Sequence, residues 1–204
     1  MSSVKAVDNL ALEPKPFDHQ TRTIFGFWAY LMTDCILFAA LFATYAVLHN
    51  NTYGGPSGRE LFDMPYVLKE TLVLLTSSFT CGLGIIAVEK RQKLQTYVWF
   101  IVTMLLGLTF LTMELKEFHH LAVTGDSWHR SGFLSSYFTL VGTHGLHITI
   151  GLLWMVIVLV QLGRRGFTKG VVRRLTLFSM FWHFLDIIWI FIFTIVYLMG
   201  ALQR

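Results

Sequence analysis

A histidine and an aspartate, His183 and Asp186, stand three residues apart inside the otherwise apolar stretch 181–191, near the end of the chain. A charged side chain at the centre of a membrane helix costs about 2.5–3.5 kcal/mol on insertion scales, so an ionisable residue there usually has a partner and a function. On a helix, two residues at this spacing share one face, and their side chains can satisfy each other. The pair indicates either a polar contact between helices or a direct role in moving protons or binding lipid.

Further ionisable residues occur within or beside other apolar segments. His144 and His147 are also three residues apart, and the flanking Gly142 and Gly145 would let a neighbouring helix come close. Asp34 is the one acid in the middle of the first apolar segment. The remaining candidates lie near the start of the second segment and the end of the third: Glu70, Glu114, Glu117, His119 and His120. All of them are candidates for buried polar contacts.

A metal site is a sharper interpretation of the same residues. Glu117 and His120 form one Glu-x-x-His motif, the spacing found in carboxylate-bridged di-iron bundles. Those sites need a second such motif and two further glutamates, but segment 144–147 contains no glutamate. The eight histidines do not form dense clusters, and Cys35 and Cys81 have no adjacent histidine and read as small packing residues. We expect no metal or other cofactor in this chain, with a stand-alone membrane di-iron or histidine-cluster oxidoreductase as the alternative.

The elements that carry these residues must be membrane helices. The chain of 204 residues is 54% hydrophobic and only 14% charged, which is too apolar for a soluble domain. Because about 20 apolar residues cross about 30 Å of hydrocarbon, five apolar runs predict five transmembrane helices. We expect an all-α integral membrane bundle forming one domain at 23–204, after a polar N-terminal tail at 1–22 that lacks the apolar core of a signal peptide. The predicted spans are about 24–48, 66–88, 96–118, 133–162 and 175–200.

The lysines and arginines predict the orientation of this bundle. Eleven of them fall in the tail and in the second and fourth connections, and five on the other side. By the positive-inside rule, the N-terminus is cytoplasmic and the C-terminus is periplasmic. The net charge of +4 is therefore explained by topology and anionic lipid, with no signal for nucleic acid. Four arginines cluster where cytoplasmic headgroups lie and are candidate ligands of a phospholipid phosphate: Arg164, Arg165, Arg173 and Arg174.

The orientation also gives approximate depths. At about 1.5 Å per residue, Asp34 lies ~15 Å, His183 ~12 Å and Asp186 ~17 Å from the cytoplasmic ends of their spans, and these three should form one belt. The glutamates and histidines at the ends of the second and third spans should form a second belt near the outer face. His144 and His147 should fall between the two belts.

The chain resembles subunit III of the haem-copper terminal oxidases. The segments that carry the resemblance are 31–38, Glu114-x-x-Glu117-Phe118-x-His120, 143–147 and 182–189, and the resemblance extends from about residue 23 to the end. Within the family, the five-helix length and the segments 25–28 and 54–58 are most similar to the subunit III of bacterial cytochrome bo-type ubiquinol oxidases.

The resemblance implies an accessory role in the bacterial inner membrane. In this family, subunit I holds the haems and copper and reduces oxygen, whereas subunit III has no redox centre, binds phospholipid and supports proton uptake by subunit I. The expected partners are subunits I, II and IV, with ubiquinol handled by the complex. Asp34 aligns with a carbodiimide-reactive glutamate of cytochrome c oxidases, and its shorter side chain keeps the acid but reduces its reach.

A small proton-coupled transporter is a third interpretation of the apolar spans. Transporters usually contain inverted repeats and discontinuous helices near the midplane of the membrane. None of the five predicted spans contains a proline, which counts against this interpretation.

Overall fold

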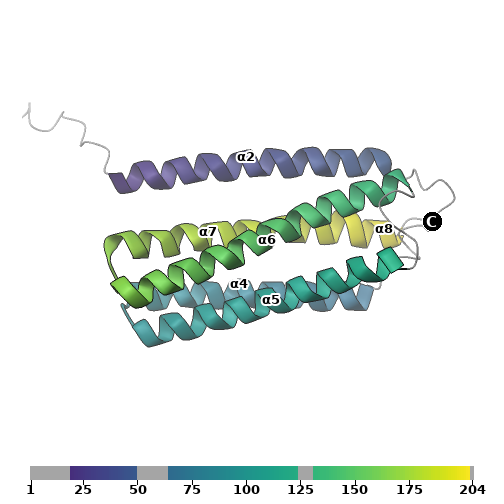
Figure 1. Ribbon diagram of the computed structural model, residues 1–204. Coiled ribbons are helices and arrows are strands. Elements are labelled where there is room, and N and C mark those ends of the chain that lie inside the picture. Colours follow the sequence, from purple (N-terminus) through teal and green to yellow (C-terminus); the bar gives the residue numbers. More distant parts are fainter. Residues whose placement is uncertain (1–18, 50–63, 124–130, 203–204) are drawn as a thin grey trace, which may run out of the picture.

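The protein is a bundle of long helices, as shown by a computed structural model that describes residues 19–49, 64–123 and 131–202 (Figure 1). Five helices are long and apolar enough to cross a membrane, so the predicted all-α bundle of five such helices is confirmed. The last of them continues through a π-helical segment. In chain order the elements are α2 (His19–Leu48), α4 (Met64–Glu89), α5 (Lys93–Val123), α6 (Gly132–Arg165), α7 (Lys169–Ile192), η1 (Phe193–Leu198) and α8 (Met199–Leu202).

The helices extend beyond the apolar runs of the sequence. α2 begins at His19, inside the stretch expected as a polar tail, and α5 begins at Lys93 and ends at Val123. Long basic side chains at helix ends can reach the headgroups, so polar residues are compatible with a further helical turn there. Most of the tail and the whole glycine-rich loop at 50–58 lie outside the described residues.

Local sequence explains where α6 and α7 begin and end. The side chains of Ser131 and Thr168 accept hydrogen bonds from the backbone N–H groups of Leu134 (3.2 Å) and Val171 (3.4 Å), as N-cap residues do. Gly166, with φ 64°, ends α6 in the left-handed region that favours glycine. The resulting tight connection returns the chain directly into α7.

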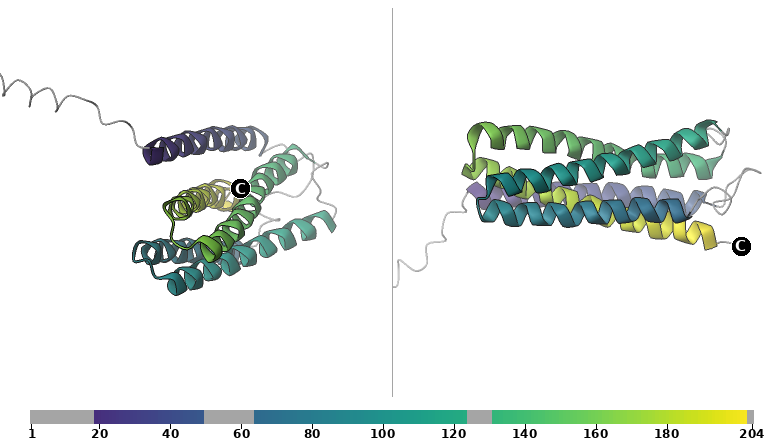
Figure 2. Two further views of the ribbon diagram at one scale, coloured as in Figure 1. Left: turned by 60° about the vertical axis from the view of Figure 1, so that its left-hand side comes forward. Right: turned by 90° about the horizontal axis from the view of Figure 1, so that it is seen from below.

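α7 lies at the centre of the bundle. Figures 1 and 2 show α2 on one side of α7 and the α4–α5 pair on the other, with α6 beside them. The α7 residue Trp182 is fully buried and donates its Nε1–H to Oγ of Ser77 on α4 at 3.2 Å. Its ring also lies against Gly107 of α5 and Gly151 of α6, where a Cβ atom would come within 2.9 Å and 3.1 Å of ring atoms. Four helices therefore meet at this indole.

α2 is attached to the bundle by a narrow stripe. It packs mainly against α6 and α7. Its buried residues recur on one face of the helix: Leu31, Asp34, Phe38 and Tyr45. Most of its other large apolar side chains, including Phe25 and Ile36 at 74% and 70% exposed, face outward. In a membrane this outer face contacts lipid or another protein.

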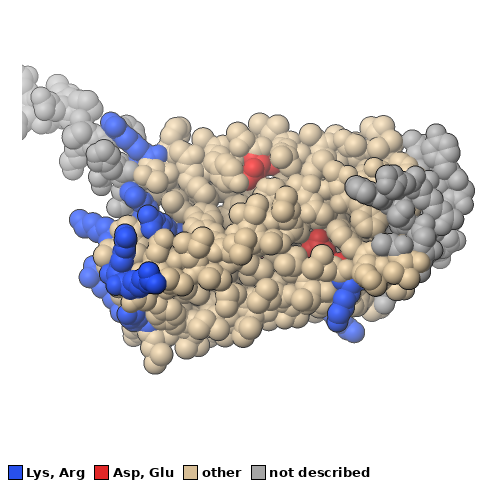
Figure 3. Space-filling model, in the orientation of Figure 1, with Lys and Arg blue, Asp and Glu red and all other residues tan. Residues whose placement is uncertain are grey.

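Basic residues gather at one end of the bundle. Figure 3 shows them at the end where α2 begins. The described residues of this end are Arg22, Lys90, Arg91, Lys93, Arg164, Arg165, Lys169, Arg173 and Arg174, whereas Lys69 and Lys116 belong to the opposite end. The helices thus bring together basic residues that are far apart in the sequence, and a cytoplasmic location of this end remains a prediction from the positive-inside rule.

Candidate functional site

Asp34 of α2 and His147 of α6 face each other across the contact between their helices. Oδ2 of Asp34 lies 3.9 Å from Nε2 of His147, and the two side chains are 10% and 13% exposed. Nδ1 of His147 is 2.7 Å from the carbonyl oxygen of Thr143. Because a carbonyl only accepts, Nδ1 carries a proton, and Nε2 is the nitrogen directed at the carboxyl group. At 3.9 Å the two groups are too far apart for a hydrogen bond or for direct proton transfer, but a carboxyl group and an imidazole are neighbours at this helix contact.

This arrangement changes the grouping expected from depth. The sequence placed Asp34 in one belt with His183 and Asp186, but Asp34 faces His147 instead. Depth along a helix fixes the height of a side chain and leaves open the face on which it lies.

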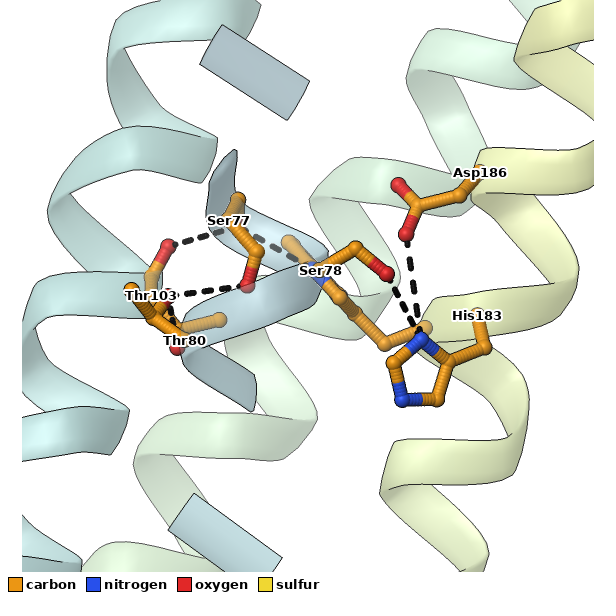
Figure 4. Close-up of polar contacts among 7 residues, drawn as sticks. Ser77, Ser78, Thr80, Thr103, His183 and Asp186 are labelled. Atoms are coloured by element: carbon orange, nitrogen blue, oxygen red, sulfur yellow. Dashed lines mark hydrogen bonds and ion pairs between the residues drawn. The ribbon is translucent and has the colours of Figure 1, made fainter. Parts of the chain in front are cut away.

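His183 and Asp186 of α7 do not form a direct hydrogen bond with each other. Nδ1 of His183 is 3.9 Å from Oδ2 of Asp186 and only 2.6 Å from Oγ of Ser78 on α4 (Figure 4). Within the described residues, neither carboxylate oxygen of Asp186 has a hydrogen-bond partner. The two side chains lie on one face of α7 within ion-pair distance, as expected, but the hydrogen bond of the imidazole is made with Ser78 and not with Asp186. A serine of another helix has no fixed sequence spacing to His183, so no local pattern indicated it.

Hydroxyl groups also connect α4 to α5 and α7 at other points. Figure 4 shows Ser77, Thr80 and Thr103 beside the Ser78–His183 pair. Oγ of Ser77 donates to the carbonyl oxygen of Thr103 at 3.2 Å, and the hydroxyls of Thr80 and Thr103 are 2.9 Å apart. Hydrogen bonds of this kind stabilise helix contacts in membranes.

Glu70, Glu114 and His144 lie in the interior of the bundle on α4, α5 and α6. Their exposed fractions are 0%, 2% and 0%, and none of their carboxylate or ring-nitrogen atoms has a hydrogen-bond partner in the described part of the chain. The carboxyl group of Glu114 fits because position 145 is glycine, where a Cβ atom would come 2.7 Å from Oε1. The His144 ring is enclosed by aromatic rings, with that of Trp189 at 5.3 Å between centroids. Buried ionisable groups without partners are costly in a membrane protein and usually have a function.

Glu117 forms a separate network with two tyrosines. Its carboxylate oxygens accept hydrogen bonds from the hydroxyls of Tyr137 and Tyr197, both at 3.3 Å, and these hydroxyls are 2.9 Å apart. Tyr197 lies in η1, and π-helical segments are frequent at functional sites. No sequence pattern pointed to either tyrosine, since they are 20 and 80 residues from Glu117. His119 and His120, close to Glu117 in sequence, are exposed near the end of α5.

The basic end of the bundle contains a pocket of about 210 Å³. Arg91 from the α4–α5 turn and Lys169 and Arg173 from α7 contribute its cations, and Ile24 of α2 is among its apolar lining residues. Of the four arginines predicted to bind lipid, only Arg173 lines this pocket. Arg174 donates to the side-chain oxygen of Gln161, and Arg164 and Arg165 are exposed.

Metal-ligating residue types do not converge within 19–49, 64–123 and 131–202. No group of three His, Cys, Asp or Glu side chains in these ranges could hold a metal ion. In the Glu117–His120 motif, the carboxylate is bonded to tyrosines and the histidine is exposed. The described side chains therefore fit polar contacts within the bundle better than a redox metal.

Comparison with known proteins gives similarity along almost the whole chain. The cytochrome c oxidase subunit III family matches residues 17–201. A "Cytochrome bo(3) ubiquinol oxidase subunit 3" from Pseudomonas aeruginosa is 56% identical over 185 residues, covering 91% of this chain and 88% of the relative. A "Quinol oxidase subunit 3" from Bacillus subtilis is 43% identical over 189 residues, covering 91% and 93%. A "Cytochrome c oxidase subunit 3" from Bacillus sp. strain PS3 is also 43% identical, over 175 residues that cover 86% and 84%.

Proposed function

The chain belongs to the cytochrome c oxidase subunit III family, and we propose that it is the non-catalytic third subunit of a haem-copper ubiquinol oxidase in the aerobic respiratory chain of a bacterium. The observation that carries the proposal is the 56% identity to a ubiquinol oxidase subunit over 91% of this chain. The relative named for cytochrome c is 43% identical, so the comparison favours ubiquinol as the electron donor of the complex. The complex would reduce oxygen to water in the bacterial inner membrane, with subunits I, II and IV as the partners of this chain.

We assign the haems and copper to subunit I of that complex. Binding two haems and a copper ion takes a set of histidines that converge from several helices. Here His144 is enclosed by aromatic rings, His147 faces Asp34 and His183 is bonded to Ser78. These three imidazoles therefore share no polar partner, although His144 and His147 both contact Phe38. No observation favours the alternative of a di-iron or histidine-cluster oxidoreductase acting alone.

We propose that the buried acids and histidines support proton uptake by subunit I. The Asp34–His147 pair is suited to this role, because it joins a carboxyl group and an imidazole at the contact of α2 with the rest of the bundle. A proton held there could be delivered to a neighbouring subunit that covers α2. We include the interior residues Glu70, Glu114 and His144 in this proposal, because their ionisable groups have no hydrogen-bond partner among the described residues.

We also propose that the basic pocket binds the phosphate group of a phospholipid. Arginine pairs phosphate through two parallel hydrogen bonds, and cations at the cytoplasmic surface attract anionic headgroups. The pocket is lined by the cationic side chains of Arg91, Lys169 and Arg173. The apolar side chains of Ile24 and Phe167 would contact the part of the lipid next to its headgroup. Arg164, Arg165 and Arg174 would add positive charge around it.

Affinity purification of the tagged chain from aerobically grown cells tests the main proposal. We expect it to co-purify with a larger haem-bearing subunit and with ubiquinol oxidase activity. Purification of the intact chain as a single polypeptide with stoichiometric iron or copper would refute the accessory role.

A further inference from the structure

The outer face of the bundle contains a groove between α4 and α7 that none of the roles above uses. Its volume is about 440 Å³. Leu75, Phe79 and Ile86 of α4 form apolar walls, and Phe79 and Ile86 are 67% and 47% exposed. Ser78 of α4 and His183 of α7 provide the polar part of its lining.

His183 is an unusual residue to find on such a surface. Its position along α7 places it about 21 Å from Lys169, near the middle of a helix that runs to Leu198, so its depth is close to the centre of the membrane. Its side chain is nevertheless 42% exposed. In contact with acyl chains alone, an exposed imidazole at this depth would lack hydrogen bonds, which is costly in hydrocarbon.

The hydrogen bonds of His183 determine what it can offer to the groove. Oγ of Ser78 is 2.6 Å from Nδ1, so this ring nitrogen already has a hydrogen-bond partner within the chain. Either group can be the donor of this bond, and the tautomer of the ring sets whether Nε2 donates or accepts. Nε2 has no partner in the described part of the chain and is the ring nitrogen left for a hydrogen bond in the groove.

The shape of the groove fits a helix. Ser78 and Gly82 are four residues apart on α4, so two small side chains lie one turn apart on the groove face. A Cβ atom at Gly82 would meet nothing within 4 Å. Small residues at this spacing let the backbones of two membrane helices approach closely. Ile187, one turn after His183 on α7, is an exposed apolar side chain at 53%.

We propose that a transmembrane helix of another oxidase subunit docks in this groove and presents a hydrogen-bonding side chain to Nε2 of His183. The partner group is a carboxyl, amide or hydroxyl at the centre of the partner helix, because Nε2 of His183 lies at that depth. An acyl chain could fill the apolar part of the groove but would leave the imidazole without a partner. The inference rests on the proposed function, since it requires neighbouring subunits.

Photo-crosslinking in native membranes tests the partner directly. The photoreactive amino acid benzoylphenylalanine replaces Phe79, a conservative change at an exposed wall position. After irradiation, mass spectrometry of the purified complex identifies the attached molecule. We expect a peptide from a transmembrane helix of another subunit. Attachment only to phospholipid or to quinone would overturn the proposal.

Two glycine variants show whether the groove itself is the docking site. A Cβ atom at Gly82 or at Gly26 would meet nothing within 4 Å, so Gly82→Leu adds bulk at the groove and Gly26→Leu adds the same bulk to α2. We expect Gly82→Leu to lower the crosslink yield at least about tenfold, since overpacking excludes the partner helix. Gly26→Leu should leave the yield unchanged. An undiminished crosslink in Gly82→Leu would overturn the proposal.

The contribution of the imidazole is measured with His183→Leu. Loss of one hydrogen bond between membrane helices should lower the crosslink yield about three- to tenfold. Ser78→Ala keeps the imidazole and should lower the yield less than His183→Leu does. If His183→Leu changes nothing, the polar contact assigned to the partner helix is wrong. A chain that co-purifies with haem-bearing subunits but crosslinks only to lipid refutes this inference alone, whereas a chain without such subunits refutes the proposed function.

Discussion

Replacing Gly107 by alanine should loosen the bundle, because the indole of Trp182 occupies the space that a Cβ atom needs. That atom would lie 2.9 Å from Cη2 and Cζ2 of the Trp182 ring and 3.1 Å from a methyl group of Leu152. The ring is held in place on its other sides. Gly151 packs against the indole, and the Nε1–H group of the indole donates a hydrogen bond to Oγ of Ser77.

The expected magnitude is the difference of two effects. Overpacking a well-packed core costs about 1–3 kcal/mol. Alanine in place of glycine inside a helix gains about 0.5–1 kcal/mol. We expect a net loss of about 1–2 kcal/mol, which corresponds to an increase of about five- to thirtyfold in the population of the opened state. Gly142→Ala is the matched control, since its Cβ atom would be 3.6 Å from Phe118, which is an ordinary contact. This variant should show only the stabilisation that alanine brings to a helix.

The buried thiol of Cys81 reports this opening. Cys81 is 0% exposed, whereas Cys35 is exposed, so the measurement uses a Cys35→Ser background. The rate at which a membrane-permeant maleimide modifies Cys81 in the intact complex, followed by mass spectrometry of its peptide, is proportional to the opened population when reclosing is fast.

We expect Gly107→Ala to raise this rate about five- to thirtyfold and Gly142→Ala to leave it unchanged or lower it. In a Trp182→Phe background, where the distal ring atoms are absent, Gly107→Ala should have a smaller effect. Equal effects of Gly107→Ala in the two backgrounds, or no effect in either, would refute the reasoning.

Three further predictions concern the acid of α2, the topology and the lipid pocket. In the assembled complex, we expect a hydrophobic carbodiimide to modify Asp34. Asp34→Asn should leave oxygen reduction largely intact, because no electron passes through this chain. Loss of quinol oxidation in a haem-replete Asp34→Asn enzyme would contradict the accessory role. A reagent confined to the periplasm should label a cysteine at Val123 and miss one at Thr168, and the reverse pattern would overturn the orientation. The double change Arg91→Gln and Arg173→Gln should lower the phospholipid that co-purifies with the complex; unchanged lipid content would leave these arginines with a topological role only.

The sequence predicted the membrane bundle well because the signal for each span is local. About 20 consecutive apolar residues identify a membrane helix without knowledge of its neighbours. The contacts between helices have no such signal. The sequence located His183, but its partner Ser78 lies 105 residues away on α4. Likewise, the sequence identified Arg173 as a candidate for lipid binding. Arg91 and Lys169 line the same pocket because the fold brings the ends of their helices together, which the sequence does not show.

Depth was the weakest of the arguments from sequence. It grouped Asp34 with Asp186, because both lie near the middle of a span. Each span presents several faces at every depth, and which face is buried depends on how α2, α4 and α6 pack around α7. The tyrosines that bond Glu117 were missed because they lie on other helices, and the sequence does not reveal which faces of those helices meet α5.

The haem and copper content of the oxidase before and after removal of this chain tests the accessory role most directly. The complex is purified with an affinity tag on the chain, the chain is released with a stronger detergent, and both fractions are analysed for haem and metals. The account predicts that all haem and copper stay with the remaining subunits and that the released chain contains neither. Stoichiometric iron or copper in the released chain would contradict it.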